Sequence, residues 1–242
     1  MDIKTTLYAV ADLFMIVAGF TTGWKFIRNY GNYLLGLEWI IVASSGTNFL
    51  IFGLVGAGET SPMYHLAFFF DAFSRSVGIT VILVLGLMKV THGFKPSAAV
   101  DIGVFGLAIA GGLIMSFFAD DLGLAAAIFY VVMNALTTVF LFYFAWRLWN
   151  AGEHRNAIAV AVVSTAAAAI AGMYDFYRIP GDDDHHTIFY ILALTTWACQ
   201  MLVYYFGYRA LHNSNERITA ASSVSNTASA RFTGYPSRTQ AN

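Results

Sequence analysis

The 242-residue sequence contains little charge, few prolines and a single cysteine. Charged residues make up 11% of the chain, whereas soluble domains carry about 25%. Because Cys199 has no second cysteine to pair with, an intramolecular disulfide and a cysteine-based metal cluster are both excluded. The formal net charge of −1 offers no basic surface to nucleic acid. We therefore expect no nucleic-acid partner.

The sequence also lacks the short motifs of several enzyme classes. It contains no G-x-S-x-G, no Walker loop and no H-E-x-x-H. The usual arrangements for serine hydrolysis, nucleotide binding and zinc proteolysis are therefore missing. We expect no catalytic residue, no metal site and no cofactor, although an enzyme without a known motif stays open.

Apolar residues are what the chain has in abundance. Hydrophobic residues account for 58% of it, and the mean hydropathy is +0.63. A helix crosses the hydrocarbon core with about 20 mainly apolar residues, and it satisfies its own backbone hydrogen bonds there. Seven stretches are long enough, so we expect an all-α polytopic membrane protein, a seven-transmembrane-helix bundle over residues 1–212. The expected spans are 6–27, 34–57, 63–88, 98–118, 123–146, 156–178 and 187–210.

Basic residues are distributed unevenly between the two ends of these spans. Lys4 and Arg178 lie on one side, Arg75 lies within a span, and the other ten lie on the opposite side. Because basic loops stay in the cytoplasm, we expect the N-terminus outside, the C-terminus in the cytoplasm, and the protein in the plasma (inner) membrane. The ten are Lys25, Arg28, Lys89, Lys95, Arg147, Arg155, Arg209, Arg217, Arg231 and Arg238.

Residues 213–242 differ in composition from the spans. They are rich in serine, threonine, asparagine and alanine, and they have no apolar period. Such a segment cannot bury enough apolar surface to fold. We expect a disordered cytoplasmic tail.

Seven short-looped helices with an external N-terminus resemble the layout of microbial rhodopsins, and the resemblance is limited to that layout. Covalent attachment of retinal requires a lysine in the last helix. The lysines here are Lys4, Lys25, Lys89 and Lys95, and none lies in the last expected span. A covalent retinal protein is therefore excluded. Seven-helix zinc hydrolases are disfavoured too, because only His65 lies near the end of a span.

Ionisable residues within a span are costly and mark candidate sites. Asp71 and Arg75 lie four residues apart in the third span, so they share a helix face within pairing distance. At 1.5 Å per residue, Arg75 lies roughly 16 Å below the outer surface, near the middle of the membrane. Two interpretations stay open: a structural ion pair that fixes this helix to its neighbours, and a site that handles a ligand or a proton.

Other expected spans offer polar side chains at similar depths. Together with Asp71 and Arg75, they predict one polar cavity that opens outward, with this pair as its floor. The alternative is ordinary hydrogen bonding between helices, at roughly 0.6 kcal/mol per pair. The further ligand- or proton-binding candidates are Asp12, Asn48, Asn134, Asp175 and Gln200.

Two charged features have simpler interpretations. Glu38 is expected to reach toward the inner boundary and pair with Lys25 or Arg28, with a separate proton site as the alternative. The run from Asp182 to His186 is expected to form an exposed acidic loop, with a weak divalent-cation or pH-sensitive site as the alternative.

Uncharged residues predict packing and anchoring. Tyrosines near the outer boundary, including Tyr64, Tyr174 and Tyr190, are expected to anchor helices at the membrane interface. Small residues in two spans predict close helix packing. They are Gly103, Gly106, Gly111 and Gly112 in the fourth span, and Ser164, Ala168 and Gly172 in the sixth.

These features favour a small-molecule or ion transporter, or a sensor. Membrane lipid and a small molecule or ion are the expected partners, and the oligomeric state stays open. An intramembrane enzyme acting on a lipid-type substrate is the first alternative, with His65, Asp71 and Asp175 as acid–base candidates. A structural subunit of a membrane complex is the second.

Overall fold

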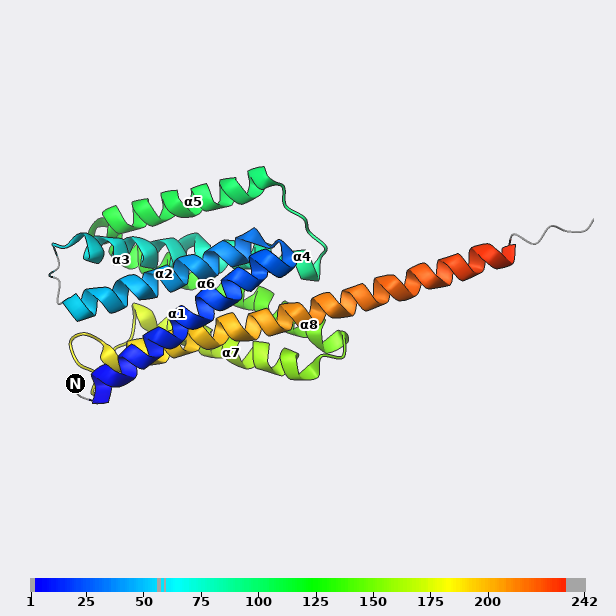
Figure 1. Cartoon of the computed structure of the whole chain (residues 1–242). Helices are drawn as coiled ribbons and strands as arrows, with labels where there is room; N and C mark the ends of the chain where they lie inside the picture. The colour runs from blue at the N-terminus through cyan, green and yellow to red at the C-terminus, as the bar shows by residue number, and fades with distance from the viewer. Residues whose placement is uncertain (1–2, 56–57, 59, 234–242) are drawn as a thin grey trace, which may run out of the picture.

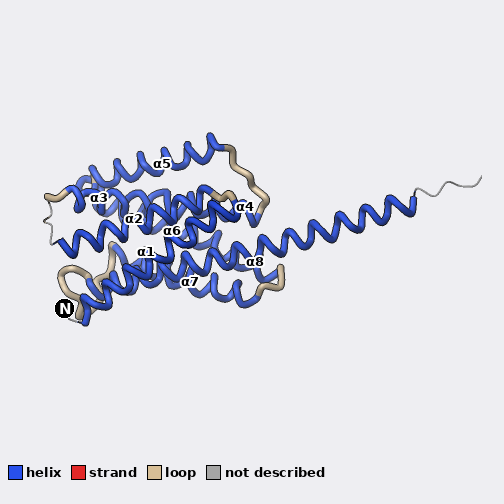
Figure 2. The backbone as a smooth tube through the Cα atoms, viewed as in Figure 1, coloured by secondary structure: helices blue, strands red, loops and turns tan. Residues whose placement is uncertain are grey.

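A computed structural model describes residues 3–55, 58 and 60–233, excluding the side chains of 119–120 and 224–233, and every regular element in this part is a helix (Figures 1 and 2). The elements are α1 (Ile3–Tyr30), α2 (Tyr33–Val55), α3 (Pro62–Phe73), the π-helix η1 (Ser74–Ile82), α4 (Leu83–Thr91), α5 (Ala98–Phe117), α6 (Ala119–Asn150), α7 (His154–Tyr174) and α8 (Thr187–Thr233).

Seven helices within the described ranges are long and apolar enough to cross a membrane. The segments α3, η1 and α4 follow one another without a break and form a single span, Pro62–Thr91. The expectation of an all-α polytopic membrane protein with seven spans is therefore confirmed. Which end of the bundle lies outside stays a prediction.

Large apolar side chains cover the outer surface of α5 and α6. In α5 only Ala108 and Gly112 are buried, while Phe117 is 79% exposed. In α6, Leu136 and Val139 are also largely exposed. An apolar surface of this extent is stable only against lipid. The chain is thus an integral membrane protein whose helices contact lipid.

Two spans begin at a serine that caps the helix. Ser61 precedes Pro62, and its side chain accepts a hydrogen bond from the Tyr64 amide at 3.2 Å. Ser97 does the same for the Val100 amide at 3.4 Å. Serine caps satisfy amides that the first helical turn leaves free, and proline fits the first helical position. These caps fix where α3 and α5 start.

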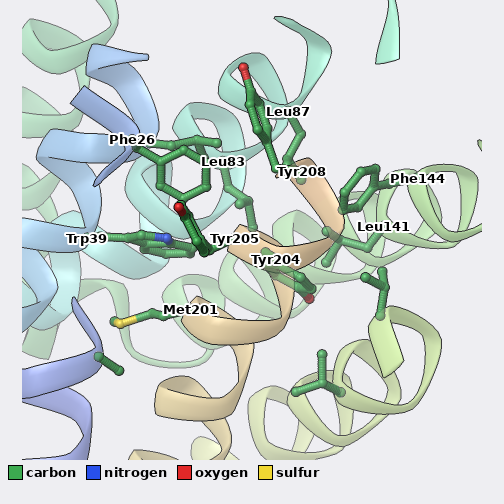
Figure 3. Close-up of a cluster of buried hydrophobic side chains, with 14 of the residues drawn as sticks. Phe26, Trp39, Leu83, Leu87, Leu141, Phe144, Met201, Tyr204, Tyr205 and Tyr208 are labelled. Carbon is green, nitrogen blue, oxygen red and sulfur yellow. The ribbon is translucent and has the colours of Figure 1, made fainter. Parts of the chain in front are cut away.

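The main apolar core lies where α1, α2 and α8 meet α4 and α6 (Figure 3). The Phe26 ring packs edge-on against Tyr205 and Tyr208, with centroid distances of 5.3 and 5.2 Å. Trp39 and Met201 extend this core along α2 and α8. The aromatic packing joins the C-terminal half of α1 to α8. It holds the bundle together away from the end where α1 begins.

Glycines bring α1 and α2 close together. A Cβ on Gly23 would lie 2.7 Å from the carbonyl oxygen of Gly36, and one on Gly36 would lie 2.9 Å from that of Gly23. Small residues commonly allow such contact between membrane helices. In α5, Gly112 does approach α3, but Gly103 and Gly106 have open space beside them. The expected close packing is wrong for those two because α5 lies at the edge of the bundle.

The helix α8 continues far past the other helices (Figure 1). It passes position 212 without a break, so residues 213–233 are helical where a disordered tail was expected. The Asn215 side chain also donates to the carbonyl of Val90 at 2.9 Å. Extending an existing helix costs far less than nucleating one, and this contact fixes the first turns of the extension. Residues 234–242 of the expected tail lie outside the described ranges.

Candidate functional site

A cavity of about 770 Å³ lies at the end of the bundle where α1 begins. It is bounded by residues near the end of α2, in α3, at the start of α6, after α7 and at the start of α8. The starts of α1, α3 and α8 and the ends of α2 and α7 lie at this same end (Figure 1). Under the predicted orientation, the cavity is on the outer side.

Arg75 forms the base of the cavity together with two aspartates. Its Nη1 atom lies 3.3 Å from Asp71 Oδ2, the predicted pairing across one helical turn. Its Nη2 atom donates to Asp175 Oδ2, which comes from the residue after α7. The hydroxyl of Tyr174 donates to Asp71 Oδ1 at 2.9 Å. One guanidinium therefore joins α3 and η1 to the end of α7.

Two tyrosine rings enclose the guanidinium of Arg75. Its Cζ atom lies 4.0 Å from the ring centroid of Tyr130 in α6 and 4.0 Å from that of Tyr174 in α7. Cations are attracted to the faces of aromatic rings at such distances. The Arg75 side chain is only 13% exposed, whereas those of Asp71 and Asp175 are 32% and 24% exposed. The carboxylates therefore face the cavity more openly than the guanidinium does.

Arg75 lies in the π-helix η1, an element that the sequence did not predict. Within it, the amide of Leu83 bonds to the carbonyl of Gly78, five residues back. Stretches of π-helix are rare and occur frequently at functional sites. The third span therefore changes its helical geometry at the residue that forms the base of the cavity.

Eight of the residues that line the cavity are phenylalanine or tyrosine. Three of them, Tyr64, Tyr174 and Tyr190, were expected to anchor helices at the membrane interface, which stays a prediction. Tyr130, which encloses Arg75, had not been selected at all. The aromatic residues that line the cavity are Phe49, Phe52, Tyr64, Phe68, Tyr130, Tyr174, Phe176 and Tyr190.

Two smaller cavities, of about 80 and 30 Å³, lie deeper in the bundle. Arg75 lines both of them as well as the large one. Asn134 lines the 30 Å³ cavity, and Gln200 lines both small ones. These two predicted candidates therefore lie beyond Arg75 and not in the walls of the large cavity. Gln200 also donates to the Tyr204 hydroxyl at 3.0 Å, which bonds to Ser164 at 2.8 Å.

Asp12 and Asn48 line none of these three cavities. The side chain of Asn48 donates to the carbonyl of Met63 at 2.9 Å and so links α2 to the start of α3. Asp12 is fully buried between α1 and α2, where a Cβ on Gly46 would lie 2.7 Å from its Oδ1. Neither carboxylate oxygen of Asp12 has a hydrogen-bond partner among the described residues. The structure thus brings together Asp71, Arg75 and Asp175.

The predicted pairing of Glu38 with Lys25 or Arg28 is wrong. The Glu38 side chain is fully buried, and its carboxylate oxygens have no hydrogen-bond partner within the described part of the chain. It faces Gly78 of η1, where a Cβ would lie 2.9 Å from Glu38 Cδ. Glycine leaves the space that this carboxyl group occupies, so Glu38 points inward instead of toward the boundary.

The acidic run after α7 lies in the α7–α8 connection and caps the start of α8. Asp182 accepts hydrogen bonds from the amides of Ile188 and Phe189 at 2.8 and 3.0 Å. Partial burial acts to raise the pKa of Asp182, but these backbone hydrogen bonds outweigh it and lower that pKa. Asp184 pairs with Arg178 at 2.8 Å, and this contact lowers the pKa of Asp184. Among the described residues, no cluster of three or more histidine, cysteine, aspartate or glutamate side chains is arranged to hold a metal ion.

A distant similarity to one known protein accompanies this geometry. A protein of Methanocaldococcus jannaschii, named as an ABC transporter permease, is 28% identical to the chain over 146 residues. The match covers 51% of this chain and 41% of that protein, so the chain spans less than half of that relative's length. No family model and no solved structure matches the chain. The chain is a polytopic membrane protein with distant similarity to a permease, which is consistent with transport.

Proposed function

We propose that this protein is a small-molecule or ion transporter, or a sensor, that binds its ligand in the cavity above Arg75. The observation that carries the proposal is the position of Arg75. It forms the base of a cavity of about 770 Å³ and also lines the two deeper ones. Ligand sites are typically concave, largely apolar and furnished with a few converging polar groups. Asp71, Arg75 and Asp175 are such groups.

The ion-pair network separates the outer cavity from the deeper ones. Arg75 pairs with Asp71 on its own span and with Asp175 after α7. Movement of either helix end changes these pairings, so ligand binding in the cavity is coupled to the contact between Arg75 of η1 and the end of α7. The distant permease similarity supports transport, in which the site is reached from both sides of the membrane.

The proposal is tested with purified protein in proteoliposomes and with the variants Asp71→Asn and Arg75→Gln. We expect both variants to abolish ligand flux, or ligand binding if the protein is a sensor, while Glu153→Gln leaves them unchanged. Glu153 is the matched control because it pairs with Arg217 at the opposite end of the bundle and does not line the cavity. If both variants lower only the thermal stability and keep flux and binding intact, the three residues form a structural ion pair and the proposal is wrong.

The enzyme alternative receives less support from the geometry. Asp71 and Asp175 converge on Arg75, but His65 does not line the cavity. Its ring instead packs edge-on against Tyr64 at a centroid distance of 5.9 Å. An acid–base reaction needs its titratable groups within reach of one substrate atom.

The second alternative, a purely structural subunit, predicts a bundle interior without a ligand-sized cavity. The cavity of about 770 Å³ above Arg75 does not favour this alternative.

A further inference from the structure

We infer that the cavity takes an organic cation, a charged nitrogen group attached to an apolar body; this rests on the proposed function and names its ligand class. The first reason is charge. Asp71 and Asp175 contribute two carboxylates, and Arg75 contributes one guanidinium. The charges of Asp71, Asp175 and Arg75 sum to −1. A bound monovalent cation neutralises this excess.

The second reason is that the positive charge of Arg75 is already satisfied. Its two terminal nitrogens point to Asp71 and Asp175, and its Cζ atom lies 4.0 Å from the ring centroids of Tyr130 and Tyr174. An anion at this guanidinium would compete with two carboxylates that already pair with it. The aspartates are the more exposed partners, so the groups offered to a ligand are negative.

The third reason is the chemistry of the wall that α2 and α3 contribute to the cavity. Phe52, Tyr64 and Phe68 form a continuous aromatic surface, with ring centroids 6.2 and 4.8 Å apart in succession. Ring faces attract quaternary and other ammonium groups, most strongly where water is excluded. The protein already holds one cation between two rings at the base of this cavity. The remaining rings present the same kind of surface to a ligand.

The approach to the cavity is also net negative. The α7–α8 connection carries Asp182, Asp183 and Asp184 against Arg178, which pairs with Asp184, and it also contributes His185 to the cavity. Clefts bordered by charge of one sign raise the local concentration of oppositely charged ligands. This arrangement favours cations at the entrance as well as inside.

The inference is tested with the full chain in lipid nanodiscs by isothermal titration calorimetry. The probes are phenyltrimethylammonium and benzoate, which share a phenyl ring and carry opposite charges. We expect phenyltrimethylammonium to bind at least about tenfold more tightly than benzoate. Asp175→Asn should weaken that binding at least about tenfold, because it removes one of the two carboxylates. The control Glu153→Gln removes a carboxylate that pairs with Arg217 at the opposite end of the bundle, and this variant should bind like the unmodified protein.

Three results would overturn the inference. One is tighter binding of benzoate that is lost in Arg75→Gln; the cavity would then still be a ligand site, and the proposed function would stand with an anionic ligand. Another is no binding of phenyltrimethylammonium at millimolar concentration. The third is equal binding by Asp175→Asn and the unmodified protein. The probes are compared on the unmodified protein first, so the test does not depend on the stability of a variant. The flux experiment judges the proposed function separately.

Discussion

The buried positive charge of Arg75 is stabilised by two carboxylates and two aromatic rings. Asp71 and Asp175 pair with its guanidinium, and the rings of Tyr130 and Tyr174 lie beside it. Arginine within a span is tolerated when it faces the interior and is paired. Without Arg75, the negative charges of Asp71 and Asp175 would repel each other. The three residues therefore form one unit, and removal of the central cation is more disruptive than removal of either aspartate.

Asp182 illustrates a carboxylate whose role is local. We predict that Asp182→Ala lowers the free energy of unfolding by about 1 kcal/mol at neutral pH, the usual cost of losing a helix cap. Because the folded pKa of Asp182 is lowered, its contribution is present above the ordinary aspartate pKa of about 3.9. It is lost as the pH falls through the lowered folded value.

The measurement is equilibrium unfolding in detergent, followed by circular dichroism at neutral and at acid pH. The difference between Asp182→Ala and the unmodified protein should shrink as the pH falls. The control Asp184→Ala removes an exposed ion pair, and such pairs contribute little. A difference that grows toward acid pH would contradict the assignment of Asp182 as a cap.

At the scale of elements, η1 depends on a glycine that no helix propensity would favour. We predict that Gly78→Ala destabilises the protein by roughly 1–3 kcal/mol, the range for adding a methyl group to a filled interior. The new Cβ would lie 2.9 Å from Glu38 Cδ. Thermal unfolding in detergent measures the effect.

The matched control is the same substitution at Gly103, which has open space beside it in α5. Alanine is favoured over glycine in a helix interior by about 1 kcal/mol, so Gly103→Ala should be neutral or stabilising. If both substitutions had the same effect, the close approach of α2 and η1 would not be the cause.

Membrane-spanning helices can be predicted from local sequence more readily than the contacts of a site can. The seven spans are visible because twenty apolar residues in a row have few alternatives to a membrane helix. The pairing of Asp71 with Arg75 follows from helix periodicity. The pairing of Arg75 with Asp175 depends on which helices become neighbours, and no local pattern contains that information. The π-helical register of η1 and the enclosure of Arg75 by Tyr130 depend on the same packing.

Several polar residues predicted to line one cavity lie in different places, because their positions also depend on helix packing. Depth in the membrane placed Asp12, Asn134 and Gln200 at levels similar to that of Arg75, but depth says nothing about the direction in which a side chain points. Asn134 and Gln200 lie on the inner side of Arg75, whereas Asp12 faces Gly46 between α1 and α2. A tyrosine near a span's end gives the same signal whether it anchors a helix or lines a cavity.

At the scale of the whole molecule, the orientation is a prediction of charge placement. We expect a cysteine introduced by Thr60→Cys to react with an impermeant thiol reagent added outside intact cells, and one introduced by Phe94→Cys to be protected. Cys199→Ser provides the background, because Cys199 is the chain's single cysteine. The basic excess lies on the side of residue 94, and basic loops stay in the cytoplasm.

Permeabilised cells supply the control for this experiment, since both introduced cysteines should then react. Reaction from outside at residue 94 but not at residue 60 would invert the bundle. The cavity above Arg75 would then open to the cytoplasm, and the ligand would be one drawn from inside the cell.

The unbroken course of α8 has a structural consequence. This helix contributes Tyr190 to the cavity wall and continues to Thr233 beyond the bundle (Figure 1). Its 47 residues correspond to a rod of about 70 Å at 1.5 Å per residue. Contacts with the bundle hold this rod as far as Arg217, which pairs with Glu153. The 16 residues from there to Thr233 extend it by about 24 Å at 1.5 Å per residue. One continuous helix therefore connects the cavity wall to a surface well beyond the opposite end of the bundle.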